Sequence, residues 1–290
     1  MYLVYDVTHM KKRIFFVTLI ACLFFAWAYG TYSYCSATLC VTSTTPENAH
    51  LFTELGHKLY HKEGKYDESE AVYKRALAAD PNFFGALTQL ADLLRHRGRY
   101  DESEQLFLKA LEVDPSQAFT YVDIAKLYRN MKRHDDALAM LKKAEALDPT
   151  LPTLWTYGYA GVYKELGELG KAEDAAKKGI ALDADDYFGY HALGDVLSSE
   201  KKYTEAEDAY LKSLSLSPRS ESSFALGWLF LYQDKLDQAE YWFNEYNNTQ
   251  PTPRAEVYVG LAKIAEKRGD SEKAEQDYEY AHYLDQTMGK

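Results

Sequence analysis

Two stretches of the chain are almost identical and begin 34 residues apart. YDESEAVYKRALAADP starts at Tyr66, and YDESEQLFLKALEVDP starts at Tyr100. The period continues, because blocks of 33 to 35 residues fill positions 50 to 286 almost without remainder. Self-similarity at a fixed period indicates a repeat architecture, in which each unit buries its apolar face against its neighbours.

Each block has the pattern of two amphipathic helices joined by a short turn. The second helix is rich in Ala, Glu, Lys and Leu, and in four blocks it is followed by Asp-Pro or Ser-Pro, as at Asp80-Pro81. Proline lacks a donor and disfavours a helical residue before it, so we expect the helix to end there. The turns between the helices hold Gly64, Gly98, Lys132, Gly167, Lys201, Asp234 and Gly269.

Small and large residues recur at fixed positions of the block. Position eight holds Ala91, Ala125, Ala160, Gly194, Gly227 and Ala262, and position twenty-four holds Tyr73, Phe107, Leu141, Tyr210, Phe243 and Tyr278. Small side chains let two helices approach closely while the large ones fill the space between them. Two blocks depart from the pattern: His57 occupies position eight in the first, and the fourth has an extra residue near Pro152.

This pattern resembles the tetratricopeptide repeat, whose signature of bulky and small residues at fixed offsets is matched by Tyr190, Leu193, Gly194, Tyr203, Ala206, Tyr210 and Pro218. The resemblance implies an all-α fold, a right-handed superhelical α-solenoid of about seven helix-turn-helix repeats. It also implies a non-enzymatic scaffold that binds a protein or peptide partner in its concave groove.

The expected organisation divides the chain into five parts. Residues 1–13 form a cytoplasmic segment, 14–34 a transmembrane or signal segment, 35–49 a polar linker, 50–286 the repeats, and 287–290 a tail. The seven expected repeats are 50–83, 84–117, 118–152, 153–186, 187–219, 220–254 and 255–286.

The expected membrane segment contains IFFVTLIACLFFAWAYG, residues 14–30, which carries no charge. Its length is at the short end of a bilayer-spanning helix. Lys11, Lys12 and Arg13 precede it, and no Lys or Arg follows until Lys58. The positive-inside rule then predicts one N-terminal transmembrane helix, with the repeats on the extracytoplasmic side of the membrane.

Two alternatives for this segment stay open. The small residues Ala26 and Ala28 fit a cleaved signal peptide, which would make the protein secreted or periplasmic. LIAC at 19–22 resembles a lipoprotein attachment box with Cys22 as the acceptor. Cys35 and Cys40 could pair as a disulfide in an oxidising compartment, or stay reduced. Translation could start at Met1 or at Met10.

Several classes of function find little support. The formal net charge of −11 disfavours nucleic acid as a partner, since phosphate binding needs a basic face. No Gly-rich phosphate loop or Gly-x-Ser-x-Gly motif occurs, so no catalytic residue and no cofactor is predicted. His57 and His61 have helical i, i+4 spacing, but Lys58 stands where a zincin needs Glu, so no metal site is predicted.

The first helices of the repeats supply the candidate groove. Its predicted residues are Lys58, Lys62, Arg95, Lys126, Arg129, Tyr157, Phe188, His191, Phe224, Trp228 and Tyr232. The cations lie towards the N-terminus and the aromatics towards the C-terminus, a combination suited to anchoring partner side chains. The alternative is that the aromatics pack between helices. Trp228 is expected to point away from the core, because Leu226 and Phe230 hold the core positions beside it.

The groove lacks the asparagines of the clamp with which some tetratricopeptide repeat proteins hold a C-terminal carboxylate. The function expected from the resemblance is therefore a membrane-tethered scaffold for a protein partner. Two alternatives are an exported or lipidated assembly factor and a small-ligand receptor that uses the aromatic groove. No polar helix follows the last repeat, so a homo-oligomer through that repeat is a further expectation.

Overall fold

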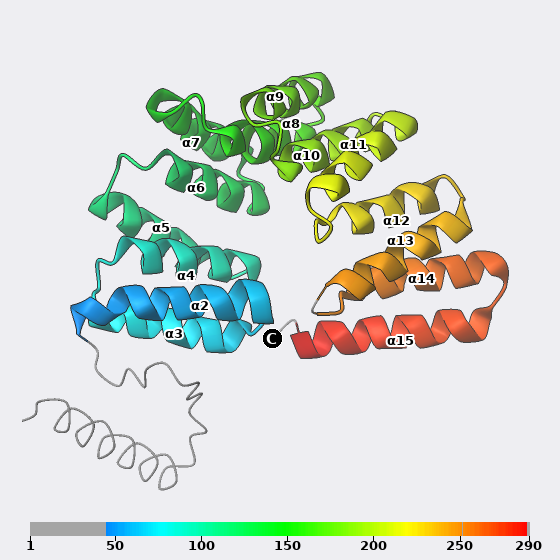
Figure 1. Cartoon of the computed structure of the whole chain (residues 1–290), viewed down its shortest axis with the longest axis horizontal. Helices are drawn as coiled ribbons and strands as arrows, with labels where there is room; N and C mark the ends of the chain where they lie inside the picture. The colour runs from blue at the N-terminus through cyan, green and yellow to red at the C-terminus, as the bar shows by residue number, and fades with distance from the viewer. Residues whose placement is uncertain (1–44, 251, 289–290) are drawn as a thin grey trace, which may run out of the picture.

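A computed structural model describes residues 45–250 and 252–288, and there the chain is a curved stack of helices without strands (Figure 1). The predicted all-α solenoid is confirmed. The predicted membrane segment, the Cys35–Cys40 disulfide and the Cys22 lipidation site lie outside the described residues. Within the described residues, none of the helices has the length and apolar character needed to cross a membrane.

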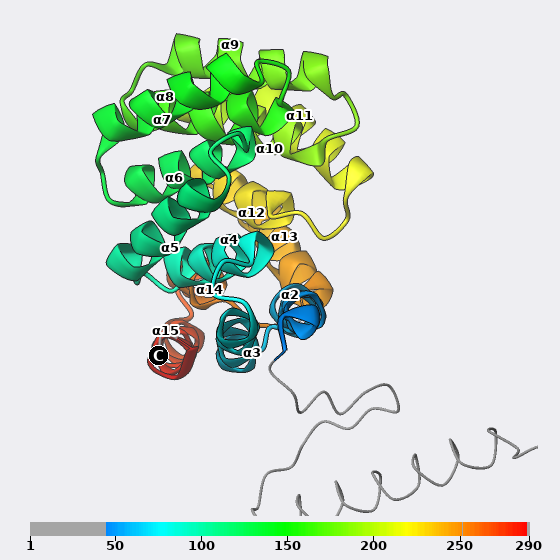
Figure 2. The ribbon, with the colours of Figure 1, turned by 90° about the vertical axis from the view of Figure 1, so that its left-hand side faces the viewer.

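The described helices form seven antiparallel pairs in chain order. They are η1 (Pro46–Asn48), α2 (Ala49–Glu63), α3 (Tyr66–Ala79), α4 (Phe84–His96), α5 (Tyr100–Val113), α6 (Ala118–Asn130), α7 (His134–Leu147), η2 (Leu154–Tyr159), α8 (Ala160–Glu165), α9 (Leu169–Leu182), α10 (Tyr187–Ser199), α11 (Tyr203–Leu216), α12 (Ser222–Tyr232), α13 (Leu236–Thr249), α14 (Ala255–Arg268) and α15 (Ser271–Met288). Figure 2 shows the pairs following one another around the arc.

The turn inside each pair depends on one residue in the left-handed region. The seven turn residues expected from the sequence all have positive φ, from 60° at Lys132 to 80° at Gly269. Glycine adopts this conformation without the steric cost that a Cβ brings. Lysine and aspartate hold the same position in the third, fifth and sixth pairs, so the turn accepts a side chain there.

The second helix of a pair ends where the sequence predicts. Asp80, Asp114 and Asp148 stand before proline and have extended backbone instead of helical backbone. Each carboxylate then accepts a hydrogen bond from the backbone N–H two residues later, at 2.9 to 3.0 Å. The aspartate therefore stops the helix by its backbone and starts the next loop by its side chain.

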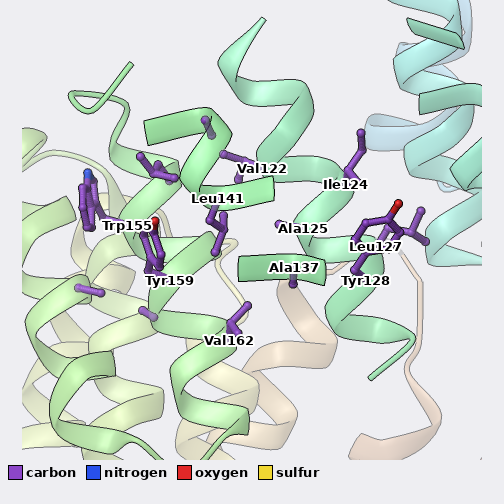
Figure 3. Packing of buried hydrophobic residues seen from close by; sticks show 14 of the residues in the cluster. Val122, Ile124, Ala125, Leu127, Tyr128, Ala137, Leu141, Trp155, Tyr159 and Val162 are labelled. Carbon is purple, nitrogen blue, oxygen red and sulfur yellow. The ribbon is translucent and has the colours of Figure 1, made fainter. Parts of the chain in front are cut away.

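The core is built where a large residue of one helix meets a small residue of its partner. Figure 3 shows Leu141, Tyr159 and their neighbours packed between α6, α7, η2 and α8. A Cβ on Gly194 would lie 2.6 Å from the ring of Tyr210, and one on Gly56 would lie 2.5 Å from the ring of Tyr73. The small residue of the first repeat is thus Gly56. The assignment of His57 to position eight was one residue late, and His57 is exposed.

The extra residue of the fourth repeat is accommodated in η2, which is a π-helix. The backbone N–H of Ala160 donates to the carbonyl of Trp155, five residues back, and the wider turn contains Tyr157. π-Helical turns often occur at functional sites. Here the turn absorbs the insertion without breaking the first helix of the pair, and it moves Tyr157 relative to the residues that precede the turn.

Ion pairs connect successive repeats at a recurring place. Arg99 pairs with Glu70 at 2.7 Å, Arg133 with Glu104 at 3.3 Å, Lys202 with Glu173 at 3.0 Å and Arg268 with Glu240 at 2.6 Å. The first three link the residue just before one repeat's second helix to the second helix of the preceding repeat, and Arg268 does so from the last residue of the first helix α14. The pairs supplement the apolar contacts in setting the angle between neighbours.

Candidate functional site

A cleft of about 370 Å³ opens on the concave side of the second half of the array. Its walls come from α8, α10, α11, α12 and the loop residue just before α14, so side chains from consecutive repeats contribute to it. The lining residues are Lys164, His191, Asp195, Ser198, Ser199, Tyr210, Glu221, Phe224, Ala225, Trp228, Leu229, Tyr232 and Arg254. Four of the predicted groove residues, His191, Phe224, Trp228 and Tyr232, therefore lie together.

The polar floor of the cleft is organised around Asp195. Lys164 Nζ donates to one carboxylate oxygen at 2.5 Å, and the hydroxyl of Tyr210 donates to the other at 2.8 Å. Burial acts to raise the pKa of Asp195, but the charges of Lys164 and His191 and these two hydrogen bonds outweigh it, so the pKa lies below its ordinary value. The carboxylate is ionised and already partnered.

His191 lies between Asp195 and a buried row of serines. Its Nε2 is 3.9 Å from an Asp195 oxygen, and its Nδ1 is 2.9 Å from the hydroxyl of Ser222. The residue types are those of a hydrolase triad. Ser222 is fully buried, however, and donates its own proton to Ser213 at 2.8 Å, so it offers no accessible nucleophile. The arrangement ties α10 to α11 and α12.

The aromatic wall of the cleft comes from one face of α12. Phe224, Trp228 and Tyr232 are spaced by four residues, with ring centroids 6.3 and 6.0 Å apart. Tyr232 is 70% exposed. Trp228 is half-buried, because it packs edge-on against Phe243 at 5.5 Å while it also lines the cleft. It therefore contributes to the core as well as to the cleft.

Cations of the chain border this aromatic wall. The Arg254 guanidinium lies 4.1 Å from the ring centroid of Phe224, and the Lys263 ammonium lies 5.2 Å from that of Trp228. Arg254 also pairs with Glu221 at 2.5 Å and Glu256 at 3.1 Å. The cleft therefore combines exposed rings with charges that have partners inside the chain.

Tyr157 and Phe188 form a second aromatic group with their ring centroids 4.5 Å apart. The Lys126 ammonium lies 4.6 Å from the Tyr157 centroid, and the Arg129 guanidinium donates to the Tyr157 carbonyl at 3.1 Å. Burial raises the pKa of the Tyr157 hydroxyl and lowers that of Arg129. These four predicted groove residues lie together and contact one another, and none of them is as exposed as Tyr232 in the cleft.

The remaining predicted cations lie towards the N-terminal end. Arg95 is 9% exposed and donates to the half-buried carboxylate of Asp92 at 2.6 Å, so this cation already has a partner. Lys58 is exposed on α2, and the side chain of Lys62 lies outside the described residues. The rings of His57 and His61 are 4.4 Å apart on the same helix. Among the residues that the structure describes, no three His, Cys, Asp or Glu side chains are arranged as metal ligands.

The sequence reasoning missed the other residues of the cleft, among them all of its charged ones and the tyrosine on its floor: Lys164, Asp195, Glu221, Arg254 and Tyr210. Asp195 stood at a groove position, but nothing marked it as the partner of Lys164, which lies 31 residues earlier. A signal was present, since Lys164 and Asp195 occupy the first helices of adjacent repeats. Recognising it needs the rotation between repeats, which the period alone does not provide.

Comparisons with known proteins bear on the fold and the family. Two family models described as tetratricopeptide repeat match, one over residues 82–150 and the other over 49–83, 189–220 and 255–287. A search of curated proteins gives no match. A tetratricopeptide repeat protein from Parabacteroides merdae is similar in structure with a TM-score of 0.58 and 18% identity, over 82% of this chain and 93% of that one.

Two further solved structures extend the comparison. A thermophilic repeat protein of Thermus thermophilus has a TM-score of 0.58 and 26% identity, over 63% of this chain and 99% of its own. A human IFIT1 dimer with m7Gppp-AAAA has a TM-score of 0.70 and 15% identity, over 82% of this chain and 59% of its own. Because the family models cover more than half of the residues and the helix pairs repeat in phase, the chain belongs to the tetratricopeptide repeat family.

Proposed function

We propose that this chain is a non-enzymatic scaffold that binds an extended segment of a partner protein in its concave groove. One apolar side chain of that segment would be seated on Phe224, Trp228 and Tyr232. Tetratricopeptide repeat proteins generally act in protein–protein interactions. A curved stack of helices offers a long concave surface for such a segment.

The chemistry of the cleft favours an apolar anchor over a charged one. Lys164 and Arg254 already have carboxylate partners, Asp195 and Glu221, at 2.5 Å each. A charged group of the partner would have to displace one of these pairs, at the cost of leaving the other member without its ion. An apolar or aromatic side chain needs no displacement, and it covers ring surface that water now contacts.

The observation that carries the proposal is the exposure of Tyr232. A tyrosine with 70% of its surface exposed, beside a half-buried tryptophan in a cleft, has the composition of a binding hot spot. Tyr241 on α13 is also exposed, at 58%, but it does not line the cleft. This residue is therefore a matched control of the same type.

The test uses the photo-crosslinking residue benzoylphenylalanine in the full-length protein in its native cell. We expect the residue at position 232, in place of Tyr232, to give a discrete adduct with one foreign protein. The same residue at position 241, in place of Tyr241, should not give that adduct. Equal adducts from both positions, or none from position 232 when the protein is folded, would contradict binding in the cleft.

We also propose that residues 14–30 tether the scaffold to a membrane as an uncleaved helix, with the repeats on the extracytoplasmic side. The support is the uncharged run itself and the three cations at positions 11–13. Mass spectrometry of the mature N-terminus tests this proposal. An intact segment is expected, whereas a terminus after Ala28 or a lipid on Cys22 would favour the exported or lipidated assembly factor.

A further inference from the structure

The first and last repeats of the array meet in space. Figures 1 and 2 both place the end of α15 close to α2 and α3, although these helices stand at opposite ends of the chain. The point of contact is the turn between α2 and α3. A Cβ on Gly64 would lie 2.8 Å from Thr252 Cγ2, a separation closer than real contacts show. Gly64 is therefore packed directly against the loop before α14.

This contact is specific to the first repeat. Gly98, Gly167 and Gly269 occupy the same turn position with φ of 73°, 76° and 80°, and a Cβ on any of them would meet nothing within 4 Å. The left-handed backbone explains why glycine suits all four turns. The close approach distinguishes Gly64 from the other three.

A second cleft, of about 310 Å³, marks the seam between the two ends. Tyr66 lines it from the first repeat. The opposite wall comes from the last two repeats and consists of Tyr246, Thr252, Pro253, Arg254, Ala255, Glu256, Leu284 and Asp285. The seam thus extends from the loop before α14 to the end of α15, well beyond the contact at Gly64.

The last helix, α15, is exposed along one side and meets the seam near its end. The outer side of α15 presents polar residues, among them Glu272, Gln276 and Glu279, which are exposed. Leu284 near its end is only 4% exposed and faces the seam. The first repeat of the same chain is therefore a neighbour of the end of α15, while Tyr280 and Tyr283 on that helix stay exposed.

We propose that this contact is an intramolecular latch that closes the solenoid and fixes the width of its concave groove. The latch consists of Gly64 and Tyr66 on one side and of residues 252–256, Leu284 and Asp285 on the other. In an open solenoid each repeat contacts only its neighbours, so small changes between repeats add up along the stack. A contact between the two ends removes that freedom. The proposal does not depend on what the groove binds.

A cysteine pair tests the contact directly. The Cβ–Cγ2 bond of Thr252 is about 1.5 Å long. The Cβ atoms of a Gly64→Cys, Thr252→Cys variant therefore lie within about 4.3 Å of each other, a separation that a disulfide spans. The background is the full-length chain with Cys22, Cys35 and Cys40 replaced by serine. The control pair is Gly98→Cys with Thr252→Cys.

We expect mild oxidation by oxidised glutathione, which accepts the two electrons, to convert most of the first variant into an intramolecular disulfide. The product is seen as a mobility shift on a non-reducing gel and as the loss of the mass of two hydrogen atoms. The control pair should stay reduced under the same conditions. If the Gly64 pair also stays reduced while its circular dichroism is that of a folded helical protein, the ends do not meet in solution and the proposal fails.

A second pair of variants tests whether the contact at Gly64 holds the first and last repeats together. Lysine is native at this turn position in the third and fifth repeats, with φ of 60° and 63°, so Gly64→Lys and Gly98→Lys keep a usable turn. Spin labels on Ala71→Cys in α3 and Gln276→Cys in α15 report the distance between the ends. We expect Gly64→Lys to lengthen and broaden that distance and Gly98→Lys to leave it unchanged. An unchanged distance in both would overturn the latch.

Discussion

The two halves of the concave face differ in the partners of their side chains, even where the repeat position is the same, as it is for Lys126 and Trp228. In the first half Arg95, Lys126 and Arg129 are held by groups of the chain itself, and Arg95 is almost fully buried. In the second half Trp228 and Tyr232 line an open cleft, and Tyr232 is mostly exposed. One repeat position can therefore hold a partnered cation in one unit and line an open cleft in another.

The largest expected effect tests whether the cores of the two halves are equally well packed. Phe107 and Phe243 occupy the same repeat position and are fully buried. Truncating either to alanine leaves a cavity, so Phe107→Ala and Phe243→Ala should each lower the free energy of unfolding by about 3–5 kcal/mol. Urea unfolding followed by circular dichroism measures both. A cost for Phe243→Ala far below that for Phe107→Ala would mean that the second half is loosely packed.

The next prediction concerns the charges. Burial acts to raise the pKa of Asp92, but Arg95 and His96 outweigh it and hold the pKa below its ordinary value. Arg95→Met leaves this carboxylate without its main partner, and we expect a loss of about 1–3 kcal/mol. Arg254→Met removes a more exposed cation from exposed carboxylates and should cost less than about 1 kcal/mol.

Unfolding midpoints of the two variants, measured at the same pH and salt, show whether Arg95 contributes more to stability than Arg254. Equal losses would show that Arg254 is as much a part of the scaffold as Arg95. The side chains of the second half would then stabilise the fold as much as those of the first half, and the contrast between the two halves would be wrong.

How far the sequence predicts this molecule depends on the range of the interaction. The 34-residue period, the turn residues and the Asp-Pro steps predicted the helix pairs and where they end, because these signals act within a few residues. The register of the first repeat was one residue late, since Gly56 and His57 are told apart only by which of them packs on Tyr73. The extra residue of the fourth repeat was visible, but its π-helical form was not.

The site was less predictable than the fold for the same reason. The aromatic stripe of α12 follows from helical spacing within one repeat. The pair of Lys164 and Asp195 and the contact of Gly64 with Thr252 join residues 31 and 188 positions apart. Those neighbours depend on the rotation accumulated along the stack, which side-chain packing sets.

A smaller effect on stability is expected at Tyr232, where the effect on binding should be large. Because the side chain is mostly exposed, Tyr232→Ala should change the free energy of unfolding by no more than about 0.5 kcal/mol. Loss of an aromatic anchor weakens binding by about 2 kcal/mol or more. The measurement is crosslinking from benzoylphenylalanine at position 199, in place of Ser199 in the same cleft. Adding Tyr232→Ala to that protein should lower the yield of the partner adduct at least about tenfold. An undiminished yield would remove Tyr232 from the site.

The smallest expected effect is a difference in the pH range over which two regions of the chain lose stability. Burial, together with the Arg95 charge, lowers the pKa of His96 in the first half to about 4. In the fourth repeat, hydrogen bonds from Lys177 and Lys202 lower the pKa of Glu173 to about 2. In both cases the unfolded chain binds the proton more readily than the folded one, so stability falls as the pH falls.

The two pH windows differ because the ordinary pKa values differ. The contribution of His96 is fully present above about pH 6.5 and is lost as the pH falls towards 4, whereas that of Glu173 is lost between about pH 4.5 and 2. Unfolding midpoints from pH 7 to 2.5 should therefore show the stability difference between the wild type and His96→Gln changing in the first window. The difference between the wild type and Glu173→Gln should change in the second. If both differences changed in the same window, the electrostatic contrast between the two regions would be wrong.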